Sequence, residues 1–296
     1  MASASAFGIL NWSLTLVSIF LFLILFILFL KIRNEQREID ISLYLTMNTC
    51  LAGFLTSFSV LVMVSSNVFE PFLLRNIDFC YVFGLFYDIF ECAIYYSYCL
   101  QSFYRLCRII YYKTRFLLSW KFYRILILIQ WLITIILLLP TLFLKWYIHL
   151  PGESYCLIPY DNLIGSFYLI LVLYSIPLIT MIVIYIWITR YIRTRTNIRA
   201  TEKQRNLRDF TAIKRIIICV LILISLRFPT IAFIFYGIGN GHLFIWTYAI
   251  VGLVTATCLI FIALMSISMT NKFKKVVLSF FNGTNNQVQP RNGTNS

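Results

Sequence analysis

The sequence predicts an all-α membrane protein: a seven-transmembrane helix bundle with a short amphipathic eighth helix. Three observations lead to this fold class. Hydrophobic residues make up 60% of the 296 residues and charged residues only 12%, which lies outside the range of soluble globular proteins. The apolar residues occur in seven long runs, each about long enough to cross a bilayer. The connections between the runs alternate between basic and nearly neutral, as loops on opposite faces of a membrane do.

The seven runs are bounded by charges or by loops with Pro and Gly. They lie at about 9–30, 42–65, 80–104, 122–144, 164–189, 213–237 and 244–268. Residues 271–281 then have the pattern of a short amphipathic helix that can lie on the inner leaflet. The remaining residues, 282–296, are polar and indicate a disordered tail. We therefore predict one seven-helix domain, residues 1–281, followed by this tail.

The first two runs have different characters. No basic residue precedes the first run, whereas a basic cluster beginning at Lys31 follows it. This polarity is wrong for a cleaved signal peptide, so we expect an uncleaved helix. Its sequon, Asn11-Trp12-Ser13, is a weak glycosylation candidate because it lies close to the membrane. The second run carries Asn48 and Gly53, residue types that suit interhelical hydrogen bonds and close helix contacts.

The third run, Cys80 to Arg108, is the most informative. It holds two acids, Asp88 and Glu91, inside an otherwise apolar helix. The 25 positions from Cys80 to Arg105 span roughly 37 Å of helix, a little more than the hydrocarbon core. One helix is therefore expected to join a thiol at one membrane face to an arginine at the other.

The later runs carry prolines and one further charge. The fourth run ends at Pro140 and is followed by the longest outer loop, 145–163. Pro177 lies inside the fifth run and predicts a kink there. Arg227 lies in the sixth run, two residues before Pro229, and the seventh run has no charge.

The distribution of Lys and Arg predicts the orientation. Basic residues gather in alternate connections and after the last run, whereas the opposite side has only Arg75 and Lys145. By the positive-inside rule the N-terminus is extracellular and the C-terminus cytosolic, and we expect the plasma membrane. The net charge of +14 is then explained by topology and by attraction to the lipid bilayer, and no nucleic-acid partner is expected.

The cysteines predict one disulfide bond. Only two of the eight, Cys80 and Cys156, fall on the predicted outer side, where oxidation is expected, so we pair them. The other six lie in or at the ends of helices, where a free cysteine acts as a small apolar residue: Cys50, Cys92, Cys99, Cys107, Cys219 and Cys258.

Two other classes of membrane protein fit less well. The chain has only two histidines, His149 and His242, both at outer positions. An intramembrane enzyme, a metal site and a cofactor are therefore not expected. A transporter or channel would also carry charges inside the membrane, but the sequence shows no internal repeat and few such charges. This class stays open as an alternative.

The residues together resemble the rhodopsin-like (class A) G-protein-coupled receptors, over about residues 9–281. The family has a cysteine 25 residues before the arginine of its acid-Arg-Tyr motif, as Cys80 precedes Arg105 here. Other family positions are matched at similar spacing by Trp131, Cys156, Pro177, Tyr185, Pro229 and the run around Phe273. No single match is specific, but their joint spacing is.

The sequence also departs from the family's pattern. Tyr104 and Leu106 flank Arg105, Gly53 stands where the family has its sodium-binding aspartate, and Arg227 replaces its sixth-helix tryptophan. The Asn-Pro-x-x-Tyr motif becomes Ile262-Ala263-Leu264-Met265-Ser266. The seventh run has no lysine, so retinal cannot form a Schiff base. A receptor that no longer couples to a G protein is therefore a second alternative.

The resemblance implies a receptor that binds an extracellular ligand, a small molecule or a peptide, and signals to a cytosolic heterotrimeric G protein. The expected ligand pocket comprises Tyr87, Asp88, Glu91, Arg227, Thr230, Ile234 and Tyr248. Within it we expect a buried ion pair between Glu91 and Arg227, since isolated charges are costly in a membrane. Asp88 could then meet a cationic group of the ligand, or be protonated, or be hydrogen-bonded to a tyrosine.

The cytosolic end is expected to contact the G protein. Its residues would be Arg105, Arg108, Tyr185, Asp209, Lys214 and Arg215. Among them, Asp209 could hold Arg105 in the resting state, so that release of Arg105 opens the site.

Overall fold

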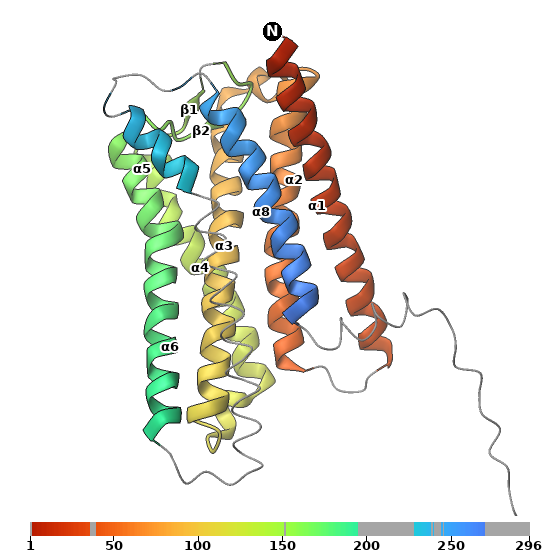
Figure 1. Cartoon of the computed structure of the whole chain (residues 1–296), viewed down its shortest axis with the longest axis vertical. Helices are drawn as coiled ribbons and strands as arrows, with labels where there is room; N and C mark the ends of the chain where they lie inside the picture. The colour runs from red at the N-terminus through yellow and green to blue at the C-terminus, as the bar shows by residue number, and fades with distance from the viewer. Residues whose placement is uncertain are drawn as a thin grey trace, which may run out of the picture.

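The computed structural model describes residues 2–35, 40–150, 152–194, 228–237, 239, 244 and 246–269, and its elements run nearly parallel to one long axis (Figure 1). The α-helices are α1 (Ala2–Glu35), α2 (Ile41–Val68), α3 (Ile77–Ile110), α4 (Trp120–Phe143), α5 (Leu163–Leu169), α6 (Ile176–Thr194), the segment Phe228–Gly237 and α8 (Thr247–Met269). A π-helix, η3 (Ile170–Ser175), joins α5 to α6, and the short 3-10 helices are η1 (Phe72–Arg75) and η2 (Arg115–Leu118). The strands β1 (Ile148–His149) and β2 (Cys156–Leu157) form an antiparallel hairpin.

Within the residues that the structure describes, five helical runs are long and apolar enough to cross a membrane. They are Ala6–Asn34, Ile41–Val68, Trp120–Phe143, Leu163–Ile192 and Thr247–Ile267. The chain is therefore an all-α protein with the helices of a membrane-spanning protein. The helix α3 is equally long, but its acids and tyrosines lower its hydropathy.

Five of the predicted runs, 9–30, 42–65, 80–104, 122–144 and 164–189, lie almost entirely inside longer helical stretches, whereas the run 244–268 begins three residues before α8. Apolar character predicts only the part of a helix that lies in hydrocarbon, whereas polar caps set where it begins. Side chains of Asp40, Asn76 and Ser119 accept backbone N–H groups at the starts of α2, α3 and α4. Of the predicted sixth helix only 228–237 is described, and the predicted amphipathic helix 271–281 and the tail lie outside the described residues.

The centre of the bundle is α3, which packs against α2, α4 and α6, while α1 packs against α2 and α8. Gly53 allows α1 and α2 to approach closely, because a Cβ atom there would collide with the ring of the fully buried Phe22. The space beside Gly53 is thus filled by an aromatic ring from the neighbouring helix.

A buried polar network joins α2, α3 and α4. Asn48 Nδ2 donates to Gln130 Oε1 at 2.8 Å, and Trp131 Nε1 donates to Asn48 Oδ1 at 3.1 Å. Gln130 Nε2 in turn donates to the backbone oxygen of Ala93 at 3.0 Å. Each amide therefore both donates and accepts, which is the condition for a buried polar group to stabilise helix contacts.

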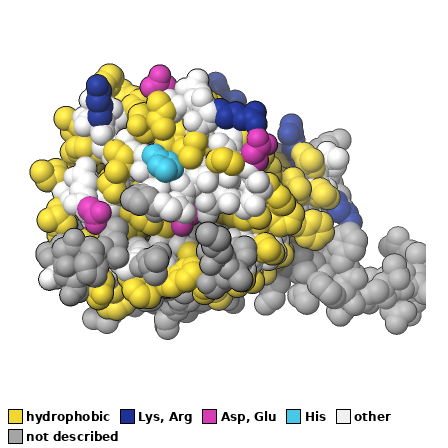
Figure 2. Space-filling model, turned by 90° about the horizontal axis from the view of Figure 1, so that it is seen from above, with side chains coloured by type: hydrophobic (Ala, Val, Ile, Leu, Met, Phe, Trp, Pro, Cys, Tyr) yellow, Lys and Arg dark blue, Asp and Glu magenta, His cyan; other side chains and the backbone are white. Residues whose placement is uncertain are grey.

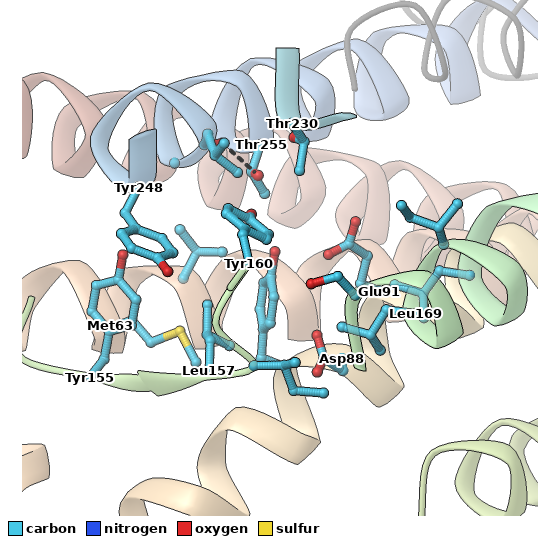
Figure 3. A pocket seen from close by; sticks show the side chains of 18 of the residues that line it. Met63, Asp88, Glu91, Tyr155, Leu157, Tyr160, Leu169, Thr230, Tyr248 and Thr255 are labelled. Carbon is cyan, nitrogen blue, oxygen red and sulfur yellow. Dashed lines mark hydrogen bonds between the residues drawn. The ribbon is translucent and has the colours of Figure 1, made fainter. Parts of the chain in front are cut away.

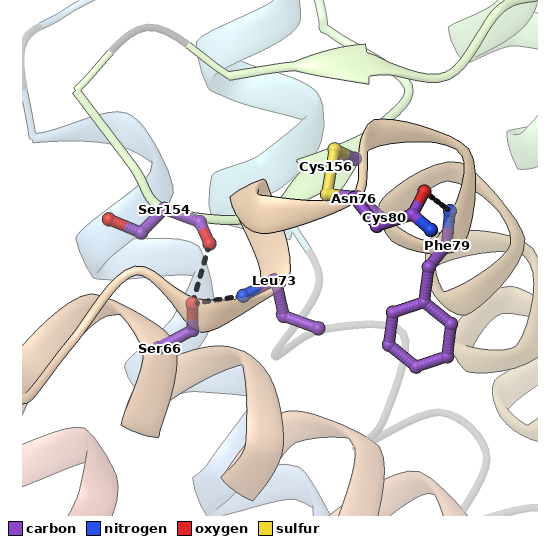
Figure 4. The surroundings of a disulfide bond; sticks show 7 residues. All are labelled: Ser66, Leu73, Asn76, Phe79, Cys80, Ser154 and Cys156. Atoms are coloured by element: carbon purple, nitrogen blue, oxygen red, sulfur yellow. Dashed lines mark hydrogen bonds between the residues drawn. A yellow bond between two sulfur atoms is a disulfide. The ribbon is translucent and has the colours of Figure 1, made fainter.

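The hairpin β1–β2 covers one end of the bundle and is fastened there twice. The predicted disulfide is confirmed: Cys80 near the start of α3 is bonded to Cys156 of β2 (Figure 4). Ser66 Oγ, at the end of α2, donates to Ser154 O at 2.9 Å and accepts from Leu73 N at 3.3 Å. Seen from this end, the described charged side chains are few and dispersed (Figure 2).

Candidate functional site

A cavity lies beneath the hairpin, between α2, α3, η3, the segment Phe228–Gly237 and α8 (Figure 3). The volume of the cavity is about 110 Å³. Six of the seven predicted pocket residues line it: Tyr87, Asp88, Glu91, Thr230, Ile234 and Tyr248. The seventh, Arg227, lies outside the described residues, as does its expected pairing with Glu91. A mainly apolar cavity with a few polar groups is the usual form of a small-molecule site.

Asp88 is anchored to the loop between α4 and β1. The hydroxyl of Tyr147 donates to Asp88 Oδ2 at 2.6 Å, and Thr141 Oγ1 donates to the same hydroxyl at 3.4 Å. Tyr147 is 2% exposed and Asp88 is 4% exposed. Burial and the adjacent Asp88 carboxylate raise the pKa of Tyr147 well above its usual range, so its hydroxyl stays a donor. Of the roles considered for Asp88, the structure shows the hydrogen bond to a tyrosine.

Glu91 is held by a tyrosine of η3. Tyr174 OH donates to Glu91 Oε1 at 3.0 Å. This π-helix ends two residues before Pro177, and the kink predicted at that proline stays a prediction. A proline lacks the N–H of a regular helix, and a π-turn is a common distortion at functional sites. Tyr174 and two other residues of η3, Ile170 and Leu173, line the cavity.

The loop around β2 forms the outer wall of the cavity. Its contribution was not predicted, although Tyr155 and Leu157 directly flank the disulfide cysteine and both line the cavity. Tyr160 stacks on Tyr248 of α8, with ring centroids 5.3 Å apart and an interplanar angle of 17°. The neighbouring Glu153 accepts from Asn67 Nδ2 at the top of α2. Burial raises the pKa of Glu153 above its usual value.

Asn11 of α1 also lines the cavity, a role that sequence reasoning missed. Its side chain is only 8% exposed, and its Nδ2 lies 2.5 Å from the place of a Cβ atom at Gly252. A buried side chain is closed to glycosyl transfer, so the sequon at Asn11 is not a modification site in the folded bundle. The signal that could have identified it is that Asn11 is the one amide side chain in the apolar run 9–30.

The predicted cytosolic residues are described only in part. Arg105 is 9% exposed and lies with Arg108 in the last turns of α3. Tyr185 of α6 packs against the cluster that contains Leu106 and Ile109 of α3. The partners expected from the sixth helix, Asp209, Lys214 and Arg215, lie outside the described residues, so the Arg105–Asp209 pairing stays a prediction.

Comparison with known proteins leaves the function to be argued from this site. No family model and no curated protein matches the chain. Within the described ranges, no group of three or more His, Cys, Asp or Glu side chains could hold a metal ion. What the described arrangement offers chemically is a small buried cavity with carboxylate, amide and hydroxyl groups in an apolar and aromatic wall.

Proposed function

We propose that this chain is a seven-helix receptor that binds an extracellular ligand in the cavity and signals to a cytosolic heterotrimeric G protein. One observation carries the proposal: the cavity lies under a disulfide-fastened hairpin and is lined by two buried acids of the central helix. Six of the residues that line it are among the seven expected from the resemblance to the rhodopsin-like receptors.

The proposed topology adds two spans to the five apolar runs. The helix α3 would be one, since its acids face the cavity and not the lipid. The predicted helix 213–237 would be the other. Lys31 and Arg33 lie at the end of α1 opposite the hairpin, which supports an extracellular hairpin and N-terminus and a cytosolic C-terminus at the plasma membrane.

A signal would cross the membrane along α3. Its cavity residue Glu91 and its cytosolic residue Arg105 are 14 positions apart, roughly 21 Å along one helix. A ligand that binds one arrangement of the helices more tightly than another shifts the population toward it. The pairings expected for Glu91 with Arg227, and for Arg105 with Asp209, are the contacts that such a shift would change.

Guanine-nucleotide exchange tests this proposal. Cells that express the chain are treated with a broad panel of ligands, with Arg105→Ala as the test variant and Arg124→Ala as the control. Arg124 is an exposed arginine on α4 outside the proposed coupling residues. A response lost in Arg105→Ala and kept in Arg124→Ala is the expected result. If no ligand of the panel raises nucleotide exchange despite good surface expression, a solute-flux assay follows. Flux through the chain would then favour the transporter alternative. The absence of flux would favour a receptor that no longer couples.

A further inference from the structure

Three buried polar atoms of the cavity have no hydrogen-bond partner of ordinary geometry in the part of the chain that the structure describes. They are Asn11 Oδ1 on α1, Thr230 Oγ1 on the segment Phe228–Gly237, and the hydroxyl oxygen of Tyr248 on α8. Leaving a buried polar atom unbonded costs free energy, so such atoms call for an explanation. All three line one cavity, and a ligand in that cavity would satisfy them.

These atoms lie on the α8 side of the cavity. Tyr248 and Gly252 are four positions apart, so they share one face of α8. The amide of Asn11 reaches Gly252, where its Nδ2 is 2.5 Å from the place of a Cβ atom. Thr230 lies on the same side of the cavity in Figure 3, whereas Asp88 lies across it. The cavity thus has a neutral polar side and an acidic side.

The neutral side selects a group that both donates and accepts. The carbonyl oxygen of Asn11 can only accept, whereas the hydroxyls of Thr230 and Tyr248 can do either. A hydroxyl group of a ligand can donate to Asn11 Oδ1 and accept from one of these hydroxyls. A ketone, ester or ether cannot donate, and a hydrocarbon can do neither.

The rest of the cavity selects an uncharged ligand with an apolar body. Asp88 and Glu91 disfavour an anion, and each already accepts a tyrosine hydroxyl. An ammonium group bound among the neutral side chains would lose its hydration without gaining a countercharge there. Apolar side chains from α2, η3 and α8 complete the wall: Val60, Met63, Val64, Leu173 and Val251.

We propose that the cavity binds a small uncharged alcohol, with its hydroxyl group at Asn11, Thr230 and Tyr248 and its apolar body toward α2 and η3. This inference rests on the proposed function, since it names the ligand class of the same site.

The test measures binding to the purified full-length chain in detergent micelles, without a G protein. Each alcohol is compared with compounds of the same carbon skeleton: hexanol with hexylamine and hexanoate, and phenylethanol with phenylethylamine, phenylacetate and ethylbenzene. The unfolding temperature is followed as each compound is titrated. We expect the alcohols to raise the unfolding temperature at lower concentrations than their matched amines, acids and hydrocarbon. A panel in which no alcohol does so would overturn the inference, and a preference for the amines would assign the cavity to cations at its acidic side.

Near-isosteric variants locate the hydroxyl group. Thr230→Val, Tyr248→Phe and Asn11→Leu each remove one of the polar atoms, and each is expected to weaken alcohol binding about 3- to 10-fold. Tyr123→Phe is the matched control, because Tyr123 also has a buried hydroxyl without an ordinary partner but lies outside the cavity. If all four variants bind the alcohols as tightly as the native chain does, the placement of the ligand's hydroxyl group at these side chains is overturned.

The unliganded variants separate a ligand-binding role from a structural one. If Thr230 serves a ligand, Thr230→Val unfolds at or above the temperature of the unliganded native chain, because only an unsatisfied polar atom has been removed. A lower unfolding temperature without ligand, together with unchanged alcohol affinity, would assign Thr230 a structural role and contradict the inference.

Failure of this inference and failure of the proposed function give different results. Alcohol binding without nucleotide exchange would leave the ligand class standing and remove the signalling role. Nucleotide exchange driven by a compound of another class, with no alcohol binding, would leave the signalling role standing and remove alcohols as the ligand class.

Discussion

Substitution of Gly84 by alanine tests how tightly the hairpin packs on α3. A Cβ atom at this position would lie 2.5 Å from the backbone oxygen of Cys156 and 3.0 Å from Cδ1 of Tyr147. The backbone at Cys156 cannot retreat easily, because the disulfide bond to Cys80 and the pairing with β1 hold it in place. The added methyl group must therefore shift the hairpin away from α3 or remain under strain.

The expected size follows from two opposing effects. Overpacking costs about 1–3 kcal/mol, whereas replacing a helical glycine by alanine gains up to about 1 kcal/mol. Because the added methyl group meets a backbone atom, the cost lies in the upper part of the overpacking range, and we expect Gly84→Ala to lower the free energy of unfolding by about 1–2 kcal/mol and the unfolding temperature by a few degrees. The assay is thermal unfolding of the oxidised chain in detergent.

Two comparisons separate the steric effect of the Gly84→Ala substitution from its other effects on stability. Gly239→Ala is the steric control, because a Cβ atom there meets nothing within 4 Å. In a background with Cys80→Ser and Cys156→Ser, Gly84→Ala should cost less, because the hairpin can then move. A Gly84→Ala chain that unfolds at the native temperature, or a cost that is the same with and without the disulfide, would refute the packing argument.

Three further perturbations have expected outcomes in the same assay. Asn48→Ala should lower the free energy of unfolding by about 1–2 kcal/mol, because it leaves the side chains of Gln130 and Trp131 without their partner. The loss should be smaller in a Gln130→Leu background, and additive losses would contradict the network. Burial raises the pKa of the Glu153 carboxyl group above its usual value of 4.5. The folded chain therefore binds the carboxyl proton more tightly than the unfolded chain does. The stability of the fold is then expected to fall as the pH rises from about 4.5 through the raised pKa. Glu153→Gln should remove this part of the pH dependence, and an unchanged pH profile would count against it. Gly53→Ala should destabilise the α1–α2 contact, and Phe22→Leu should recover part of the loss by making room; no recovery would argue against that collision.

Much of the fold can be predicted from the sequence because the hydrocarbon of a bilayer limits which residues a membrane-spanning helix can have. A helix in hydrocarbon must be apolar over about 20 residues, so the apolar runs locate the helices directly. The positions of Cys80 and Cys156 followed from topology, since they were the two cysteines expected at the oxidising face. The cavity positions of Tyr87 and Thr230 were expected only from the resemblance to the rhodopsin-like receptors, and both residues line the cavity.

What sequence reasoning missed depends on contacts between distant segments. Asn11 has the pattern of a surface sequon, and only its packing against Gly252 of α8 makes it a cavity residue. The pairing of Tyr147 with Asp88 joins an irregular loop to α3, and a loop has no periodicity from which the direction of a side chain can be read. The π-turn that places Tyr174 beside Glu91 has no sequence signal beyond the nearby proline.

The proposed function requires that a ligand in the cavity controls the end of the bundle that holds Arg105. The most direct test is guanine-nucleotide exchange by a heterotrimeric G protein reconstituted with the purified chain, measured against the concentration of any compound that raises it. The account predicts that Thr230→Val shifts the response to higher concentrations at unchanged maximum, whereas Arg105→Ala abolishes the maximum without changing ligand affinity. A response that neither substitution changes would contradict the account.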